Sequence, residues 1–177
     1  MIEKLILVDC NDVACGEAEK MEAHRAGLRH RAFSVMIYDA KKRLLLQQRA
    51  EHKYHSAGLW ANTCCGHPRP GEEIQHAAER RLNEEMGLTC SLQPVGQVAY
   101  RLRLENGLYE HEVTHLFAAY WTQEVFVPNP EEVQNTAWQH LADIAEAVQA
   151  QPGLYARWFR LYWLKYANSV FRQPIHT

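Results

Sequence analysis

The chain of 177 residues has no long apolar run, and nothing in it approaches the roughly 20 consecutive apolar residues of a membrane-spanning helix. Its first residues, 1–11, hold only the short apolar run Leu5–Val8, without the basic start and longer apolar core of a signal peptide. Repeats and low-complexity tracts are also absent from the sequence. We therefore expect a soluble, cytoplasmic protein with no membrane partner.

The sequence also has few cysteines and little net charge. The five cysteines are an odd number without the spacing of a disulfide framework, which favours reduced thiols. The formal net charge is only -2, whereas proteins that bind a nucleic-acid backbone normally need a basic face, so we expect no nucleic-acid partner. With 47% hydrophobic residues, the chain is long enough for one well-packed core but short for two, and we predict a single domain over residues 1–177.

Turn and helix signals divide this domain into strands and helices, which predicts an α+β fold. Strands are predicted over Leu5–Asp9, Ala32–Tyr38, Arg43–Gln48, Val95–Glu105 and Leu108–Trp121. The pair Asn106-Gly107 is typical of a two-residue turn and makes the last two strands a hairpin. One helix is predicted from about Glu72 to the terminating Gly87, and another over about 152–168, where aromatic residues recur at helical spacing.

Residues 66–88 carry the most specific motif. Gly66 is followed after five residues by Glu72, and after seven more by Arg80-Arg81-Leu82-Asn83-Glu84-Glu85-Met86-Gly87-Leu88. This box resembles the Nudix signature Gly-x5-Glu-x7-Arg-Glu-U-x-Glu-Glu-x-Gly-U, with Arg81 in place of one glutamate. Each of the two arginines stands four residues before a glutamate, and surface ion pairs would explain that spacing alone. The glycines at both ends favour a functional site instead.

In the Nudix family, which this segment resembles, the box glutamates hold divalent cations that bind the diphosphate of the substrate. Oxygen ligands suit Mg²⁺, which completes its octahedron with phosphate oxygens and water. Arg81 removes one such carboxylate and adds a guanidinium that suits a diphosphate. We expect the helix to bind a diphosphate but to cleave it poorly.

A second group of polar residues is scattered along the sequence: His24, His30, His67, Glu110 and Glu112. Any one of the 10 histidines is more often a structural residue than a ligand. However, His67 stands two residues after Cys65, and strand alternation puts Glu110 and Glu112 on one face. The same alternation points Cys64 away from Cys65. Imidazole and carboxylate ligands suit Zn²⁺, Mn²⁺ or Fe²⁺ better than Mg²⁺ alone, although spacing by itself leaves this site a hypothesis.

From about Lys20 to Trp158, the chain resembles the type 1 isopentenyl-diphosphate isomerases, which are Nudix-fold enzymes. The resemblance rests on His24, His30-Arg31-Ala32-Phe33-Ser34, Arg49-Ala50, Lys53, Trp60-Ala61-Asn62, Cys65-Gly66-His67-Pro68, Arg80-Arg81, Glu85-Met86-Gly87, Tyr100-Arg101 and Glu110-His111-Glu112-Val113. It implies a mixed β-sheet sandwiched between α-helices. It also implies that Arg81 is typical of the family rather than a defect in the box.

The resemblance assigns a role to each site residue. The catalytic residues it implies are Cys65 and Glu112, on opposite faces of the alkene, and Tyr100 beside Glu112. The implied ligands of one divalent metal, Mn²⁺ or Zn²⁺, are His24, His30, His67, Glu110 and Glu112. Glu85 would contact a Mg²⁺ that also touches the diphosphate. The remaining implied substrate-binding residues are Lys20, Arg49, Lys53 and Arg81 for the diphosphate, and Trp158 over the reacting carbons.

The implied reaction converts isopentenyl diphosphate into dimethylallyl diphosphate and supplies isoprenoid precursors. Protonation of the alkene gives a tertiary carbocation, and deprotonation moves the double bond. Water would capture that cation, so a dry pocket with aromatic faces is needed, for which Trp158, Trp60 and Tyr100 are candidates. The only partner implied is a small allylic or homoallylic diphosphate, bound by a monomer or weak dimer.

Two other functions remain open at this point. A Nudix pyrophosphohydrolase acting on a diphosphate-containing substrate is favoured by Glu84-Glu85 and disfavoured by Arg81. A binding domain whose His, Cys and Glu cluster only stabilises the fold through a metal would turn over nothing. Release of inorganic phosphate would indicate the first, and unfolding on chelation without turnover would indicate the second.

Overall fold

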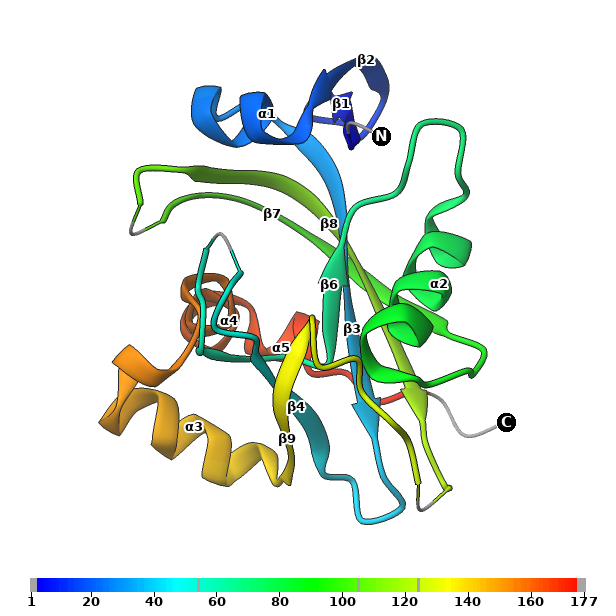
Figure 1. Cartoon of the computed structure of the whole chain (residues 1–177), viewed down its shortest axis with the longest axis vertical. Helices are drawn as coiled ribbons and strands as arrows, with labels where there is room; N and C mark the ends of the chain where they lie inside the picture. Colours follow the sequence, from blue (N-terminus) through cyan, green and yellow to red (C-terminus); the bar gives the residue numbers. More distant parts are fainter. Residues whose placement is uncertain (1–2, 54, 105, 124, 175–177) are drawn as a thin grey trace.

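The computed structural model describes residues 3–53, 55–104, 106–123 and 125–174, and shows a curled mixed sheet with helices on both sides (Figure 1). Its strands are β1 (Lys4–Val8), β2 (Ala14–Glu19), β3 (His30–Tyr38), β4 (Leu44–Arg49), β5 (Trp60–Ala61), β6 (Cys64–Gly66), β7 (Gln93–Arg103), β8 (Tyr109–Tyr120) and β9 (Val133–Gln139). Its α-helices are α1 (Lys20–Ala26), α2 (Ile74–Met86), α3 (Leu141–Ala150), α4 (Arg157–Leu161) and α5 (Ala167–Val170). The predicted α+β class and sandwich arrangement are confirmed.

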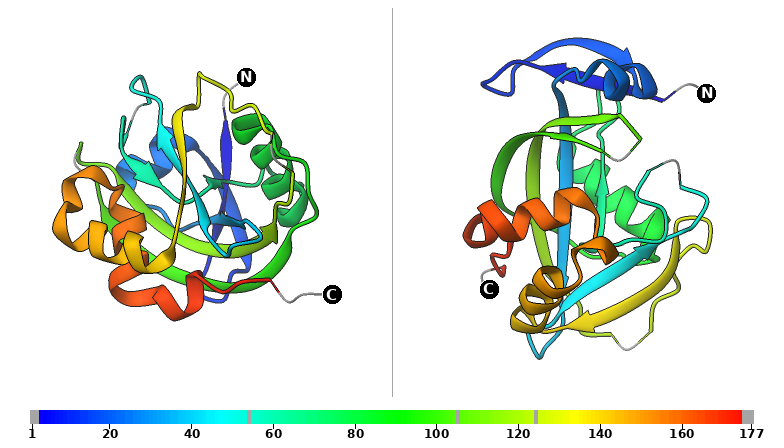
Figure 2. Two further views of the ribbon diagram at one scale, coloured as in Figure 1. Left: turned by 90° about the horizontal axis from the view of Figure 1, so that it is seen from below. Right: turned by 90° about the vertical axis from the view of Figure 1, so that its left-hand side faces the viewer.

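Strand β3 organises the sheet. It runs parallel to β8 along its whole length, from the pair His30 and Glu112 to the pair Tyr38 and Tyr120, and antiparallel to the short β6. The predicted hairpin is formed by β7 and β8, although Glu105, the predicted end of its first strand, lies outside the described residues. At one end of the molecule, the β1–β2 hairpin and α1 stand beside the rest of the sheet (Figure 2). This topology brings His30 and Glu112, which are far apart in sequence, into direct register.

The two faces of the sheet bury separate hydrophobic cores because strand side chains alternate. On β3, Val35 and Ile37 pack with α2, whereas Met36 and Tyr38 pack with α3, α4 and α5. All four of these side chains are fully buried. The central strand therefore has helices on both faces and is held in place from both sides, which gives the site a rigid base.

Helix α2 contains most of the Nudix-like box. It begins at Ile74, two residues after the predicted start at Glu72, because the carboxylate of Glu73 accepts hydrogen bonds from the backbone of Gln75 and His76 and caps the helix. It ends as predicted at Gly87, whose φ of 67° lies in the left-handed region. Both ends were encoded locally, which is why the sequence located this helix within two residues.

Gly87 also allows a close approach of two backbone segments. A Cβ added there would overlap the carbonyl oxygen of Val127, besides straining the positive φ. We expect Gly87→Ala to lower the free energy of unfolding by more than the roughly 1 kcal/mol that a positive φ costs an alanine. Denaturant unfolding should show a smaller loss for Gly71→Ala, since Gly71 has φ 79° but no atom within 4 Å of an added Cβ. Equal losses for the two variants would contradict the role of the Val127 contact.

The C-terminal segment differs from the single helix predicted over about 152–168. Residues Pro152–Leu154 form one 3-10 turn, α4 begins only at Arg157, Tyr162–Tyr166 form a π-helical turn, and α5 extends to Val170. The helix cannot begin at Pro152 because Tyr155 has an extended backbone and the next amide, of Ala156, donates a hydrogen bond to the carbonyl of Trp60. That contact ties the start of α4 to β5, next to the site.

Several elements were not predicted: β2, α1, β5, β9 and α3. Strand β2 reads Ala-Cys-Gly-Glu-Ala-Glu and is mostly exposed, so it carries little apolar alternation for sequence reasoning to detect. Among the described residues, no helix is both long and apolar enough to cross a membrane.

Candidate active site

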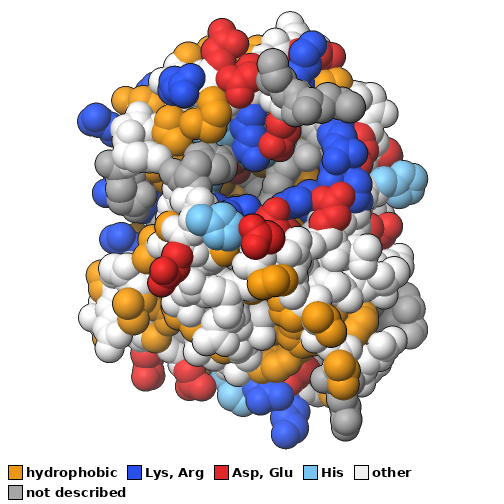
Figure 3. Space-filling model, viewed as in Figure 1, with side chains coloured by type: hydrophobic (Ala, Val, Ile, Leu, Met, Phe, Trp, Pro, Cys, Tyr) orange, Lys and Arg blue, Asp and Glu red, His pale blue; other side chains and the backbone are white. Residues whose placement is uncertain are grey.

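A cavity of about 870 Å³ is lined by residues of the N-terminal hairpin, α1, the sheet, α2 and the start of α4. Figure 3 shows a hollow on this side of the molecule with basic and acidic side chains around it. The structure brings together at its wall all but two of the residues proposed from the sequence: Lys20, His24, Arg49, Lys53, Cys65, His67, Arg81, Glu85, Tyr100, Glu110, Glu112 and Trp158. The exceptions are His30, which is fully buried next to Glu112, and Trp60, which lies partly buried on β5.

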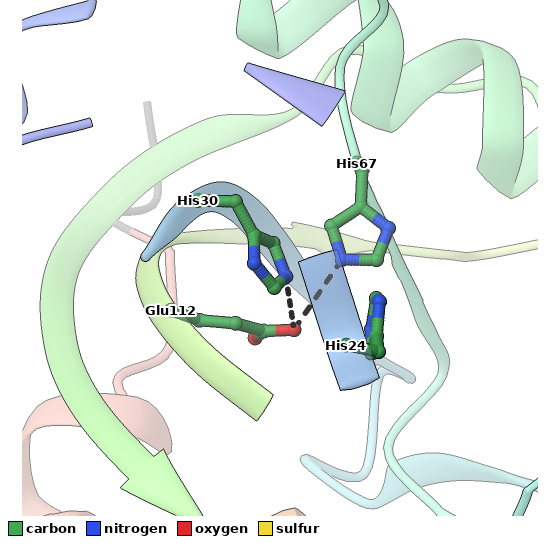
Figure 4. A group of neighbouring side chains, drawn as sticks. All are labelled: His24, His30, His67 and Glu112. Atoms are coloured by element: carbon green, nitrogen blue, oxygen red, sulfur yellow. Dashed lines mark hydrogen bonds and ion pairs between the residues drawn. The ribbon is translucent and has the colours of Figure 1, made fainter. Parts of the chain in front are cut away.

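Four of these residues form a compact group that could hold a metal ion. One ligand atom from each of His24, His30, His67 and Glu112 lies within 4.8 Å of the others. The Oε1 atom of Glu112 is 3.3 Å from Nε2 of His67 and 3.7 Å from Nε2 of His30 (Figure 4). Glu110 lines the same cavity and is buried, but it does not belong to this group. Three imidazoles and one carboxylate are a donor set typical of Zn²⁺ or Mn²⁺ sites.

Backbone carbonyls determine the tautomers of two of these histidines. Nδ1 of His24 lies 2.7 Å from the carbonyl oxygen of Lys20, and Nδ1 of His30 lies 2.8 Å from that of Leu28. A carbonyl only accepts, so each Nδ1 carries a proton and each neutral ring keeps a lone pair on Nε2. Nε2 of His30 is buried and has no hydrogen-bond partner among the described residues, which is the state of an atom placed for a metal.

Burial favours the neutral imidazole at two positions, His67 and His24. It lowers the pKa of His67 to about 4, and it lowers the pKa of His24 as well. Because a metal ion binds the neutral imidazole, the group needs little proton release from histidine before it can bind one. The residues present therefore fit a divalent metal.

The carboxylate of Glu112 is held from both sides. Its Oε1 faces the histidines, while Oε2 accepts hydrogen bonds from the hydroxyl groups of Tyr100, at 2.7 Å, and Thr114, at 3.1 Å. Strand alternation produces this arrangement, because Glu112 and Thr114 share one face of β8 and Tyr100 pairs with Glu112 from β7. One oxygen is thus directed to the histidine group and the other to a phenol.

Cys65 lies on β6 beside the same cavity. Its Sγ is 3.3 Å from the hydroxyl of Ser34 and donates to Oδ1 of Asn62 at 3.2 Å. Burial raises the pKa of Cys65 to about 12, so the side chain is a protonated thiol at neutral pH. Cys64 is fully buried in the core beneath α2, on the other face, as the alternation predicted.

Several basic residues of the cavity are paired with glutamates. Lys20 lies 2.9 Å from Glu3, and Lys53 pairs with Glu132. Arg81 pairs with Glu84 at 2.7 Å, with Glu85, and with Glu132 at 3.3 Å. Arg49 instead lies over the ring of Trp158, with its guanidinium carbon 5.3 Å from the ring centroid. An anion that enters this cavity meets cations that already have partners.

Comparison with known proteins gives a family for this site. The NUDIX domain model matches residues 28–159. A curated protein of Pectobacterium atrosepticum named isopentenyl-diphosphate Delta-isomerase is 46% identical, covering 97% of this chain and 99% of that protein. A Burkholderia multivorans protein of the same name is 49% identical, with 90% of each chain covered. The chain belongs to the Nudix-domain isopentenyl-diphosphate Delta-isomerases. The family resemblance predicted from the sequence is confirmed.

Solved structures agree with the fold of this isomerase family member. The DR0079 protein of Deinococcus radiodurans superposes with a TM-score of 0.73 at 15% identity, covering 93% of this chain and 99% of that one. The MutT protein of Methanosarcina mazei Go1 gives a TM-score of 0.62 at 20% identity, covering 79% of this chain and 94% of that one. At these identities the likeness concerns the fold alone.

Two of the proposed site residues lie outside the segment that the NUDIX domain model matches. Lys20 and His24 precede that segment and belong to α1.

Sequence reasoning gave no role to several residues that this isomerase site contains. Glu132 contacts Lys53 and Arg81 from the loop before β9. Asn62 and Ser34 contact Cys65, and Tyr162 in turn contacts Ser34 at 2.8 Å. Asn62 and Ser34 fell within segments that carry the family resemblance, Tyr162 belongs to the aromatic pattern that predicted the C-terminal helix, and Glu132 belongs to no motif. Tertiary contacts were needed to find the roles of the last two.

Proposed function

We propose that the chain isomerises isopentenyl diphosphate to dimethylallyl diphosphate by moving protons between Cys65, Glu112 and the substrate carbons. One observation supports this above the others: a thiol and a carboxylate from different strands face one cavity, which also contains a metal-fitting group and a set of cations. A homoallylic diphosphate has the two parts that such a cavity would bind, an anion and a short apolar chain.

The proposed reaction adds a proton to the terminal carbon and removes one from the carbon next to the oxygen-bearing one. One of the two residues donates and the other accepts, from opposite faces of the alkene, and they exchange these roles in the reverse direction. Tyr100 orients the carboxylate of Glu112 through its 2.7 Å hydrogen bond. The indole of Trp158, which is 3% exposed, supplies an aromatic face for the cationic intermediate and excludes water.

We assign the histidine group, with Glu110 beside it, to one divalent metal, Mn²⁺ or Zn²⁺, and Glu85 to a Mg²⁺ that accompanies the diphosphate. A metal bound to the carboxylate of Glu112 would stabilise its ionised form, and Mg²⁺ would neutralise phosphate charge. Lys20, Arg49, Lys53 and Arg81 are the proposed diphosphate-binding residues, and all line the cavity. Because one chain supplies every one of these groups, we propose that a monomer or weak dimer is active.

Proton exchange tests the proposed function directly. The purified protein, incubated with isopentenyl diphosphate in heavy water, should incorporate deuterium into the carbon skeleton without releasing inorganic phosphate. Nuclear magnetic resonance reports both on the same sample. Phosphate release with an unlabelled skeleton would instead indicate the pyrophosphohydrolase, the alternative that Glu84-Glu85 favours and Arg81 disfavours. If neither deuterium incorporation nor phosphate release is seen, and the protein unfolds when the metal is chelated, the metal-stabilised binding domain would be indicated.

Glu132 should compete with the diphosphate, because its carboxylate contacts both Lys53 and Arg81. We expect Glu132→Gln to lower KM for isopentenyl diphosphate about threefold to tenfold at unchanged kcat, which corresponds to roughly 1 kcal/mol of lost competition. Steady-state kinetics at several substrate concentrations measures this. Glu131→Gln is the matched control, because Glu131 is exposed and contacts only His52 among the pairs described. A higher KM in Glu132→Gln would mean that the carboxylate helps to bind the substrate instead.

A further inference from the structure

A single buried amide connects two residues of the proposed site. Asn62 lies between β5 and β6 and is fully buried. Its Oδ1 accepts hydrogen bonds from Sγ of Cys65 at 3.2 Å and from Nε1 of Trp158 at 3.3 Å. Its Nδ2 donates to the backbone carbonyls of Val35 at 3.2 Å and Cys64 at 3.0 Å. Two polar atoms therefore make four contacts, two to backbone and two to side chains of the site.

The chemistry of the partners determines which way this amide points. Carbonyl oxygens only accept, so the nitrogen of Asn62 must face Val35 and Cys64. The indole nitrogen of Trp158 only donates, so the oxygen of Asn62 must face it. If the amide were flipped, its oxygen would face the two backbone carbonyl oxygens, and its NH₂ group would face the indole N–H of Trp158. The orientation of Asn62 is therefore unique, and its oxygen is available to Cys65 and Trp158 alone.

Cys65 and Trp158 are each held by one further contact. Ser34 contacts Sγ of Cys65 from the other side at 3.3 Å, and Arg49 lies over the Trp158 ring. Asn62 itself is not among the residues that line the cavity, so it can act on a substrate only through its two partners. Cys65 comes from β6 and Trp158 from α4, and this oxygen is a contact shared by both.

We infer that Asn62 is a positioning residue that sets the placement of the Cys65 thiol relative to the Trp158 indole. This inference rests on the proposed function, in which the thiol exchanges a proton with a carbon that the indole covers. A displacement of about 1 Å between reacting groups can cost about 10²-fold in rate. The hydrogen bonds described for Asn62 go to Val35, Cys64, Cys65 and Trp158 and none goes to Arg49, Lys53 or Arg81, so we expect binding of the anion not to depend on it.

The test compares Asn62→Ala with a matched control, Thr63→Val. Thr63 is the next residue and equally buried, and its hydroxyl contacts only the backbone, donating to the carbonyl of Leu45 at 2.6 Å and accepting from the amide of Ile37 at 3.0 Å. Removing that hydroxyl should destabilise the fold without moving Cys65 or Trp158. Denaturant unfolding of both variants measures the stability loss that each one carries.

We expect kcat to fall about 10²-fold in Asn62→Ala with KM for isopentenyl diphosphate within about twofold, whereas Thr63→Val keeps its kcat. A kcat loss in Asn62→Ala no larger than in Thr63→Val, or a loss confined to KM, would overturn the inference.

A second measurement does not require turnover. The indole N–H resonance of Trp158, assigned through Trp158→Phe, should shift and exchange faster with solvent in Asn62→Ala but not in Thr63→Val. An unchanged resonance in Asn62→Ala would overturn the inference. If the unaltered protein incorporates no deuterium, the proposed function fails, while the indole resonance still decides whether Asn62 holds Trp158.

Discussion

Replacing Cys65 by alanine is expected to lower kcat for isopentenyl diphosphate isomerisation by about 10²–10⁴-fold, the usual contribution of a proton-transferring side chain. Its thiol faces the cavity and keeps its proton, because burial raises its pKa to about 12. The cations that line the cavity are unaltered in this variant, so KM should change by no more than about twofold. Deuterium incorporation in heavy water, followed over time, measures the loss.

Cys90→Ala is the matched control for this variant. Cys90 is also a partly buried thiol, but it packs against the core beneath α2 and does not line the cavity. It should keep the kcat of the unaltered protein. A Cys65→Ala variant with undiminished isomerisation would remove Cys65 from the mechanism, and a hydrolase would hardly respond to the same change.

Replacing His67 by glutamine is expected to abolish most metal binding by the histidine group and to lower turnover by at least about 10²-fold. Nε2 of His67 lies 3.3 Å from Oε1 of Glu112, and the ligand atoms of the group lie within 4.8 Å of one another. Changes to residues around metal ligands already cost about 10–100-fold in affinity, so loss of a ligand should cost more. The measurement is the metal content per chain of the purified protein, with Zn²⁺ and Mn²⁺ measured separately.

His55→Gln is the comparison for His67→Gln. The His55 ring stacks near that of His24, with 6.5 Å between their centroids, but His55 does not belong to the four-residue group. Metal content should therefore remain that of the unaltered protein. Unchanged metal content in His67→Gln would show that other residues hold the metal.

Local signals explain which parts of the fold were predictable. The Asn106-Gly107 turn and Gly87 each demand a particular backbone conformation from a few neighbouring residues, and β7, β8 and α2 were predicted accordingly. The prediction of a single helix over about 152–168 was wrong, because its first residues form a 3-10 turn and an extended residue before α4 begins. The aromatic spacing of this segment is helical, but the extended backbone at Tyr155 follows from a hydrogen bond between Ala156 and Trp60, which no local pattern encodes.

The same distinction applies to the site. Cys65, Arg81 and Glu112 were found because they stand within segments that resemble one family, and the family matches confirm that resemblance. Glu132 was missed because a single polar residue carries no spacing. Tyr162 was recognised only as part of the aromatic pattern of the C-terminal helix, and its contact with Ser34 depends on how that helix packs. Glu132 gains its role only where the loop before β9 meets Lys53 and α2.

By itself, the sequence determined the α+β class, the box helix, the central hairpin, the isomerase family and the residue types of the site, because each follows from short-range patterns or from matched segments. Only the tertiary structure decided that His24, His30, His67 and Glu112 converge, and that Glu110 stands outside that group. It also decided how the side chains of Glu112 and Cys65 are held, through the hydrogen bonds of Tyr100 to Glu112 and of Cys65 to Asn62. The physical reason is that hydrogen bonds and metal-ligand geometry depend on distances of a few ångströms, which the parallel pairing of β3 with β8 and the docking of α4 establish across long separations in the chain.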